Sequence, residues 1–569
     1  MSPVARLARL YPWSVDPDED LRRAVAFLGW ERSAAGVLRA SYGAGLVGAA
    51  LTLLLSAVAP TRLRLLSLLL SSTVTLVVMS SFTLVPRLLA TARRVRALGD
   101  APALVGRAVL SMRLSPSPER AAVFAARASD TPLADSLGRH VRQVRGTHAS
   151  ALERFGDEWA EWFPALARSL ALVGTAAELP AEERDRSLDR ALSVVLDGTR
   201  DQLRSFGEQI RGPLTALYAF GILLPTALVA LLPAAHAAGV GVTPLSVAVV
   251  YDLLLPAVLV TAAAWLLARR PATFPPPAVR RSHPDVPDVP DRRLTAVLTG
   301  LAAGVAGWYG TALALPKWAP PIAAVGLGTG TALLAQYRPY LAVHERVAAV
   351  EEGLTDALAL VGRRVSNGRS VESAVAATAE DVTGPIGRVF ETAARQQRQL
   401  QVGVERAFVG EYGALEHVPS RRLRDSVAFL GLAASHGAPA GPAIRSLATH
   451  VDELQRVERS ARSTLRSVCG TLQSTGTVFG PLVAGATVAL ADGMAGGGSG
   501  GLPGGGSELP WLGLAVGWYV LVLAAVLPTL STGLVRGLDR ALVAVRVGRA
   551  LAVGTVVYLG SYLVVGGIA

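Results

Sequence analysis

The sequence predicts an all-α, polytopic helical membrane protein with about nine transmembrane helices and two duplicated helical-bundle domains in the cytoplasm. Three observations lead to this prediction. Hydrophobic residues make up 51% of the 569 residues and charged residues only 17%, which is too apolar for a set of soluble domains. Apolar runs of about 20 residues, long enough to cross a bilayer as helices, recur along the chain. Arginines flank these runs, and long polar stretches separate them.

The apolar runs fall into pairs, and the order of pairs and polar stretches occurs twice. The linker between the halves contains Pro275, Pro276 and Pro277, which exclude a helix there. The expected spans are 42–59, 65–85, 213–233, 245–268, 294–315, 319–337, 468–490, 510–530 and 551–569. The expected order is an N-terminal segment (1–41), a pair (42–85), a polar helical domain (87–211), a pair (213–268), the linker (269–293), a pair (294–337), a second polar helical domain (338–466) and three C-terminal helices with a glycine-rich outer loop (468–569).

The distribution of arginines predicts the orientation of the chain. Arginines are enriched in the N-terminal segment, in the linker and between the last two expected spans, where Arg536, Arg540, Arg546 and Arg549 lie. Positive residues favour the cytoplasmic side, so these segments and both polar domains are expected there. Arg62, Arg64 and Lys317 are the few exceptions. Nothing before the first apolar run is typical of a signal peptide.

The two polar stretches share short sequence motifs. Leu104-Val105-Gly106-Arg107 recurs as Leu360-Val361-Gly362-Arg363, and Ser117-Pro118-Glu119-Arg120-Ala121 resembles Ser370-Val371-Glu372-Ser373-Ala374. A further repeat within the second stretch relates Ser366-Asn367-Gly368 to Ser435-His436-Gly437. Each of these two copies predicts a helix, a glycine that ends it and a new helix, and Gly368 can take the left-handed cap. In the first stretch, Ser117 before Pro118 and Glu119 predicts the start of a helix. A duplicated unit of antiparallel helices is the simplest interpretation.

This arrangement resembles the F-domain family of type II secretion systems, and in particular the longer archaeal membrane platform proteins of type IV-like pili and archaella. The units at 354–377 and 427–447, the weaker copy at 104–126 and the paired spans carry the resemblance. It implies a multi-pass protein of the cytoplasmic membrane that anchors a secretion ATPase and couples it to pilin-like subunits in the bilayer. It leaves a homodimer open, and it does not identify the filament as an adhesive pilus, an archaellum or a secretion pseudopilus.

The sequence lacks the patterns of common catalytic sites, and we expect no enzymatic activity and no cofactor. Lys317, the only lysine, follows Pro316 and precedes Trp318, so it does not belong to a phosphate-binding loop. The eight histidines show no metal-ligand spacing, and Cys469 is the single cysteine. A formal Gly-x-Ser-x-Gly match around Ser499 lies in the glycine-rich loop and is interpreted as chance. No nucleic-acid motif accompanies the net charge of +12.

Two groups of residues are candidate sites. A dense set of arginines in the second polar domain is a candidate docking surface for the ATPase, although cations near a helix C-terminus also occur for purely structural reasons. Asp252 is a carboxylate inside the fourth span, which makes it a functional candidate. Alternatively, Asp252 has a structural role, and its carboxyl group forms hydrogen bonds with backbone groups near Pro256 or with Tyr218. The docking candidates are Arg363, Arg364, Arg369, Arg388, Arg395 and Arg398.

Two other functions fit parts of the sequence. Two parallel halves of four spans each would also suit a secondary transporter, but only Asp252 stands out at the level of the membrane midplane, and large helical domains have no evident use in a carrier. A membrane-bound signalling scaffold lacks any catalytic motif here. The glycine pairs Gly300/Gly304 and Gly326/Gly330 are spaced for close helix contacts and not for binding phosphate.

Overall fold

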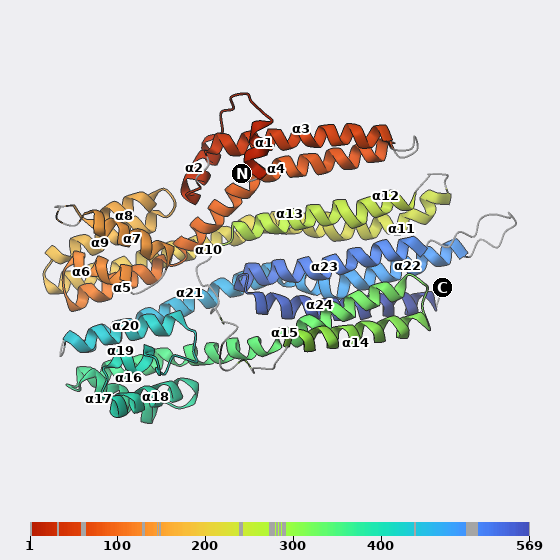
Figure 1. The fold of residues 1–569 in the computed structure, drawn as a ribbon. Coiled ribbons are helices and arrows are strands. Elements are labelled where there is room, and N and C mark those ends of the chain that lie inside the picture. The colour runs from red at the N-terminus through yellow and green to blue at the C-terminus, as the bar shows by residue number, and fades with distance from the viewer. Residues whose placement is uncertain are drawn as a thin grey trace.

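The computed structural model describes residues 3–30, 33–58, 64–127, 131–144, 146, 149–237, 243–271, 279, 283, 286, 292–436, 440–496 and 510–567. Within these residues all regular secondary structure is helical, which confirms the all-α prediction. The molecule is elongated, with long helices at one end and two groups of shorter helices at the other (Figure 1). Most of the linker at 269–293, the loop at 497–507 with Ser499, and Gly437 lie outside the described residues.

Seven helical segments of the described chain are long and apolar enough to cross a membrane, which supports a multi-pass membrane protein. Three arginines predicted between the last two spans, Arg540, Arg546 and Arg549, instead lie within the final helix, and Arg536 is the last residue of the helix before it. The final helix begins early because Asp539 caps it: its Oδ1 accepts hydrogen bonds from Ala541 N at 2.9 Å and Leu542 N at 3.0 Å. The seven segments are Ala34–Leu54, Val74–Leu114, Ala181–Leu231, Pro244–Ala268, Ala440–Gly493, Trp511–Arg536 and Arg540–Gly566.

Two further long helices lie beside these segments. Helix α14 (Arg292–Ala312) and the first half of α15 (Ala319–Glu352) pack against each other, and α15 packs along α24 (Arg540–Gly566). They coincide with the predicted spans 294–315 and 319–337. Glycines and threonines make these two helices less apolar than the seven segments, so the count of nine stays a prediction.

Four long helices connect the apolar helices with the shorter ones. None ends at the predicted boundary between span and polar domain, and three carry a proline inside the helix, at Pro86, Pro213 and Pro339. The fourth, α21, is continuous from Ala440 to Ser474 and has a proline only in its first turn. The four are α4 (Arg64–Leu98), α10 (Ala181–Tyr218), α15 and α21 (Ala440–Ser474).

Domain 1, defined as α5 to α9 with the first part of α10, has its own apolar core. Buried Leu104, Phe155 and Leu166 belong to it. Ser117 precedes helix α6, as the sequence predicts, and its Oγ accepts a hydrogen bond from Arg120 N at 3.3 Å. The helices are α5 (Ala101–Leu114), α6 (Pro118–Arg127), α7 (Pro132–Gln143), α8 (Ala151–Ala160) and α9 (Pro164–Thr175), followed by a 3-10 turn at Ala176–Glu178.

Domain 2, defined as α16 to α20 with the first part of α21, has a second core. Helix α16 ends before Gly368, whose φ of 88° lies in the left-handed region, and Ser370 caps the next helix by accepting from Ser373 N at 3.2 Å. The helix end at Gly368 was predicted, and Ser370 is the counterpart of Ser117, the helix start predicted in the first stretch. The helices are α16 (Leu354–Ser366), α17 (Val371–Asp381), α18 (Gly384–Leu400), α19 (Val404–Val409) and α20 (Arg421–His436).

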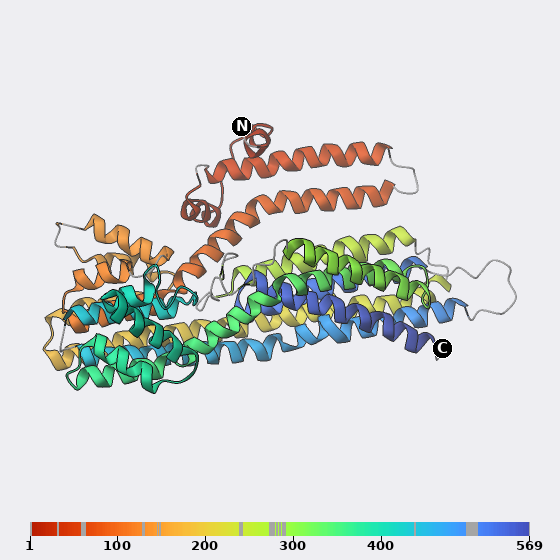
Figure 2. The ribbon, with the colours of Figure 1, turned by 60° about the horizontal axis from the view of Figure 1, so that its bottom comes forward.

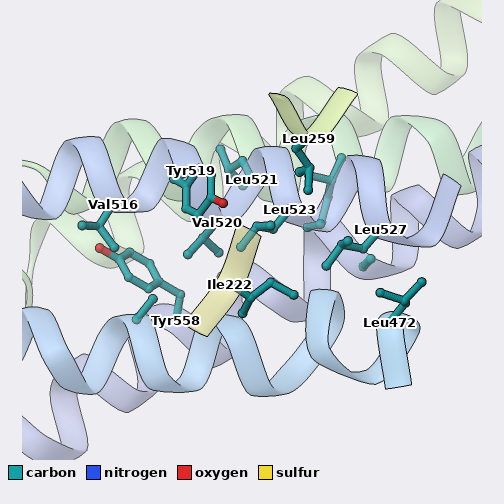
Figure 3. Packing of buried hydrophobic residues seen from close by; sticks show 14 of the residues in the cluster. Ile222, Leu259, Leu472, Val516, Tyr519, Val520, Leu521, Leu523, Leu527 and Tyr558 are labelled. Carbon is teal, nitrogen blue, oxygen red and sulfur yellow. The ribbon is translucent and has the colours of Figure 1, made fainter. Parts of the chain in front are cut away.

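The apolar bundle is held together by residues from both halves of the chain. Figure 3 shows Ile222, Leu259 and Leu472 among buried side chains of α23. Tyr519 donates a hydrogen bond to the carbonyl of Gly221, whose α-helical donor four residues on is missing because residue 225 is proline. The remaining bundle elements are π-helix η2 (Ala219–Leu223), α11 (Leu224–Ala237), α12 (Pro244–Ala248), π-helix η3 (Val249–Leu254), α13 (Leu255–Ala268), π-helix η4 (Thr475–Phe479), α22 (Gly480–Gly496) and α23 (Pro510–Arg536).

The predicted glycine contacts are confirmed. A Cβ added to Gly300 would lie 2.7 Å from the carbonyl oxygen of Gly328, and one added to Gly304 would lie 3.0 Å from that of Ala324, so α14 and α15 approach closely. Likewise, a Cβ on Gly330 would lie 2.8 Å from the carbonyl oxygen of Gly548 in α24. Small residues allow such approach in apolar bundles.

The N-terminal helices stand apart from this bundle. Helices α3 (Ala34–Val58) and α4 form a hairpin beside it (Figure 2). Helices α1 (Pro3–Arg9) and α2 (Glu19–Leu28) lie against its base. Arg87 of α4 pairs with Asp18 at 2.7 Å, and the guanidinium of Arg94 lies 3.4 Å from the ring centre of Trp162 in domain 1. The hairpin is therefore tied to domain 1 through its polar end.

Candidate functional site

The six candidate arginines occupy two places in domain 2. Arg363 and Arg369 are exposed near the turn between α16 and α17. Arg364, at the same turn, is half-buried, because its guanidinium pairs with Asp381 and donates to Thr378 Oγ1 at 2.7 Å. Arg364 therefore stabilises the domain internally and is the least available of the six for a partner.

The other three arginines lie on α18. Arg388, Arg395 and Arg398 are all exposed, and their spacing puts them on one side of the helix. With Arg363 and Arg369, they form no ion pair within the described part of the chain. Helix α17 packs against both α16 and α18. The candidate surface is thus two patches, one at the end of α16 and one on α18.

The most elaborate polar site joins domains 1 and 2, and it was not singled out from the sequence. Arg107 of α5 is only 4% exposed. Its Nη1 donates to Asp425 Oδ2 of α20 at 2.9 Å, and its Nη2 donates to Asp100 Oδ2 at 3.0 Å. Asp100 also accepts from Thr131 Oγ1 at 2.7 Å. We call the set Arg107, Asp100, Asp425 and Thr131 the interdomain cluster.

A second polar group fixes the start of α20. Arg422 donates to Glu351 at 3.3 Å and to Glu458 at 2.7 Å, and Ser420 donates to Glu351 at 2.5 Å. Glu351 belongs to α15 and Glu458 to α21, the two long helices that run from domain 2 into the apolar bundle. The first turns of α20 are therefore tied to both long helices and, through Asp425, to domain 1.

At the far end of the same contact between α5 and α20, the surface has an open groove of about 430 Å³. Leu114, Phe124 and Leu432 contribute apolar lining, and Arg120 and Arg127 contribute positive charge. The groove marks the place where the two domains separate at the surface. Its lining residues are Ser111, Leu114, Ser115, Glu119, Arg120, Val123, Phe124, Arg127 and Leu432.

The carboxyl group of Asp425 has an altered affinity for protons. Burial raises its pKa from 3.8 to about 6, and the nearby charge of Arg107 opposes this shift. One guanidinium serves two carboxylates here, because Asp100 also binds Arg107. The opposing effect of Arg107 is therefore incomplete, and a proton on Asp425 relieves the excess negative charge.

This shift predicts a pH dependence of stability. A group whose pKa is higher in the folded than in the unfolded protein stabilises the fold fully below its unfolded pKa, and this contribution is lost as the pH rises through the folded value. Relative to Asp425→Asn, the wild-type protein should lose thermal stability as the pH is raised from about 5 to about 7. Thermal unfolding of both proteins at a series of pH values measures the difference. Parallel curves would contradict the assignment to Asp425.

Asp252 lies in π-helix η3 and is exposed. The neighbouring Tyr251 points inward, where its hydroxyl donates to the carbonyl of Pro225 at 2.6 Å and its ring stacks edge-on against Tyr519. Within the described chain no hydrogen bond joins the Asp252 carboxylate to Tyr218 or to backbone near Pro256, the two structural partners considered for it. The carboxylate is thus presented at the surface of an apolar segment.

The described residues contain no group of three or more histidine, cysteine, aspartate or glutamate side chains arranged to hold a metal ion. Cys469 is buried in α21. Comparison with known proteins gave no further assignment: no protein-family model, no curated protein and no solved structure matches this chain. The candidate sites therefore rest on the geometry described above.

Proposed function

We propose that the chain is a non-enzymatic membrane platform for assembling a type IV-like filament or for type II-like secretion. In this proposal it lies in the cytoplasmic membrane, anchors a secretion ATPase and couples it to pilin-like subunits. The observation that carries the proposal is a set of three long helices, α10, α15 and α21, that run from the two domains into the apolar bundle, together with α4, which joins domain 1 to the N-terminal hairpin. A stiff helix can pass a displacement from a docked motor to the bilayer without chemistry in this chain.

Matching positions in the two halves of the chain support this proposal. The two copies of the shared motif begin at Leu104 and Leu360. The same sequence separation relates the two π-helices, Ala219–Leu223 and Thr475–Phe479, and also relates Pro225 to Pro481. Each π-helix continues a long helix, α10 or α21, that leaves a domain. We infer that each half is a copy of one unit that joins a helical domain to membrane helices.

The secondary transporter is the alternative function. A carrier places polar groups along an enclosed pathway near the midplane. Asp252, the one polar residue that stands out at the predicted midplane, is exposed. This position favours a contact with another membrane component over a substrate site between helices.

We propose nine spans, with both domains on the cytoplasmic side. This topology requires α14 and the first half of α15 to cross the membrane, which places the exposed Lys317 between them on the outer side. In a Cys469→Ala background, Lys317→Cys should react with a membrane-impermeant maleimide added to intact cells, whereas Glu183→Cys in domain 1 should react only after permeabilisation. If Lys317→Cys is protected and Glu183→Cys is labelled, the proposed orientation is wrong.

The docking surface can be tested by reversing charges. Arg363→Glu with Arg369→Glu, and separately Arg388→Glu with Arg395→Glu, change exposed arginines and leave the Arg364–Asp381 pair intact. At least one double variant should reduce ATPase recruitment on the order of tenfold and impair filament formation, because complementary charge speeds and selects encounters. Recruitment by the wild-type protein should also weaken with salt.

A matched control separates position from net charge. Arg154→Glu with Arg190→Glu makes the same charge change at exposed positions of domain 1. Co-purification of the ATPase and filament counts measure both effects. Normal recruitment by both domain 2 variants would exclude these patches, and a loss that occurs only in the control would move the docking surface to domain 1.

A further inference from the structure

In the contact between domains 1 and 2, each domain inserts an apolar residue into the core of the other. Leu110 of α5 belongs to the apolar core of domain 2, and Val457 of α21 belongs to the core of domain 1. A Cβ on Gly106 would lie 2.2 Å from Nε2 of His450 in α21, so α5 and α21 touch at a residue without a side chain. Each domain thus contributes to the other's interior.

Arg107 sits at the centre of this contact. Its buried guanidinium is shared between Asp100 of its own domain and Asp425 of the other. Without Asp425, Arg107 would keep only Asp100 of its own domain as a partner, and the charged contact across the domains would be lost. Separation of the domains would therefore expose apolar surface and also break the one ion pair in the cluster that crosses between them.

The long helices that leave the two domains are also in contact. Gly207 of α10 lies against Thr464 of α21, and both helices continue into the apolar bundle. A fixed orientation of the two domains would therefore also fix the relative positions of α10 and α21 where they enter the membrane. If the domains were free to reorient, α10 would move with domain 1 and α21 with domain 2.

We propose that the Arg107–Asp425 pair is a latch that holds the two domains in one orientation, so that they move as a single body and displace α10 and α21 together. The role in transmitting movement to the membrane rests on the proposed platform function. The latch itself does not, because the relative position of the domains can be measured in the isolated protein.

The test is a distance measurement between the domains of the full chain in lipid nanodiscs. Spin labels on Glu183→Cys in α10 and Glu391→Cys in α18, in a Cys469→Ala background, occupy exposed positions of domains 1 and 2. Double electron–electron resonance should give one narrow distance distribution for the parent protein. Asp425→Ala and Arg107→Met should each broaden it about twofold, since each removes the charge that crosses the contact.

Two comparisons separate a latch from general loosening. Arg113→Met removes another ion pair of α5, with Asp189, that lies wholly within domain 1, and it should leave the distribution narrow. The double variant Arg107→Met with Asp425→Ala should be no broader than either single variant, because both remove the same contact. If Arg107→Met fails to fold, Asp425→Ala decides, since it leaves Arg107 paired with Asp100.

An unchanged distribution in Asp425→Ala would overturn the proposal, and so would equal broadening in Arg113→Met. In cells, Asp425→Ala should keep normal ATPase recruitment and lose most filament formation. If Asp425→Ala broadens the distance distribution in nanodiscs but causes no defect in cells, the latch is supported and its role in filament assembly is refuted. If Asp425→Ala loses ATPase recruitment, the latch would not act only after the ATPase has docked, and that part of the proposal would be wrong.

Discussion

Gly330→Val is expected to lower the thermal stability of the protein by several degrees. The Cβ of valine would lie 2.8 Å from the carbonyl oxygen of Gly548 and 3.0 Å from the backbone nitrogen of Ala552, both in α24. These are backbone atoms that cannot rotate away, so α15 and α24 must separate. Overpacking of this kind costs about 1–3 kcal/mol and occasionally more. Close packing of small residues is a main source of helix association in a bilayer, and the loss should be at the upper end.

Gly310→Val is the matched control. Gly310 lies in α14, and a Cβ there meets nothing within 4 Å. The unfolding of both variants can be followed with a thiol-reactive dye, because Cys469 is the single cysteine and is buried until the bundle opens. Equal stability of Gly330→Val and the wild-type protein would mean that α15 and α24 do not pack as described.

Asp252→Leu is expected to abolish filament assembly while leaving the isolated protein at least as stable as the wild type. A charged carboxylate near the centre of a span costs about 2.5–3.5 kcal/mol on insertion scales, and the exposed Asp252 has no internal partner in the described chain to offset that cost. Its replacement by leucine should therefore favour the fold. We expect its functional use to be a contact with a polar group of a membrane-embedded partner such as a pilin-like subunit.

Asp252→Asn and Asp492→Leu complete the experiment. Asparagine retains a hydrogen-bonding group and should preserve part of the assembly. Asp492 accepts a hydrogen bond from the Tyr562 hydroxyl at 2.9 Å, so Asp492→Leu should reduce stability because that hydroxyl loses its acceptor. Filament counts and dye-based unfolding measure the two effects separately. Reduced stability of Asp252→Leu would identify a structural role, and normal filaments would exclude the proposed contact.

The helical architecture could be predicted because its signals are local. Apolar runs of membrane length, the capping serine Ser370 and the left-handed Gly368 act within a few residues of the chain. The glycine pairs on α14 and α15 were identified as contact points for the same reason, since spacing along one helix determines which glycines share a face. Helix ends were less predictable, because α4, α10, α15 and α21 continue past the predicted domain boundaries.

The roles of individual charged residues depended on tertiary structure. Arg107 and Arg363 occupy the same position of one motif, yet Arg107 is buried in an ion pair between domains and Arg363 is exposed. The glycines before them both contact α21, at His450 and at Arg445. What differs is the neighbour on the other side, because α20 lies along α5 and brings Asp425 to Arg107. Asp425 is 318 positions away in the sequence, and no local pattern specifies such a pairing.

The sequence by itself therefore determined that the chain is helical, rich in membrane-length segments and built around recurring motifs. Only the tertiary structure decided which arginines are available at the surface, that Asp252 faces outward, and that the two domains share a buried ion pair. The physical reason is that helix formation and capping depend on neighbours within one or two turns. The burial, pairing and proton affinity of a charge depend on whatever the fold places around it.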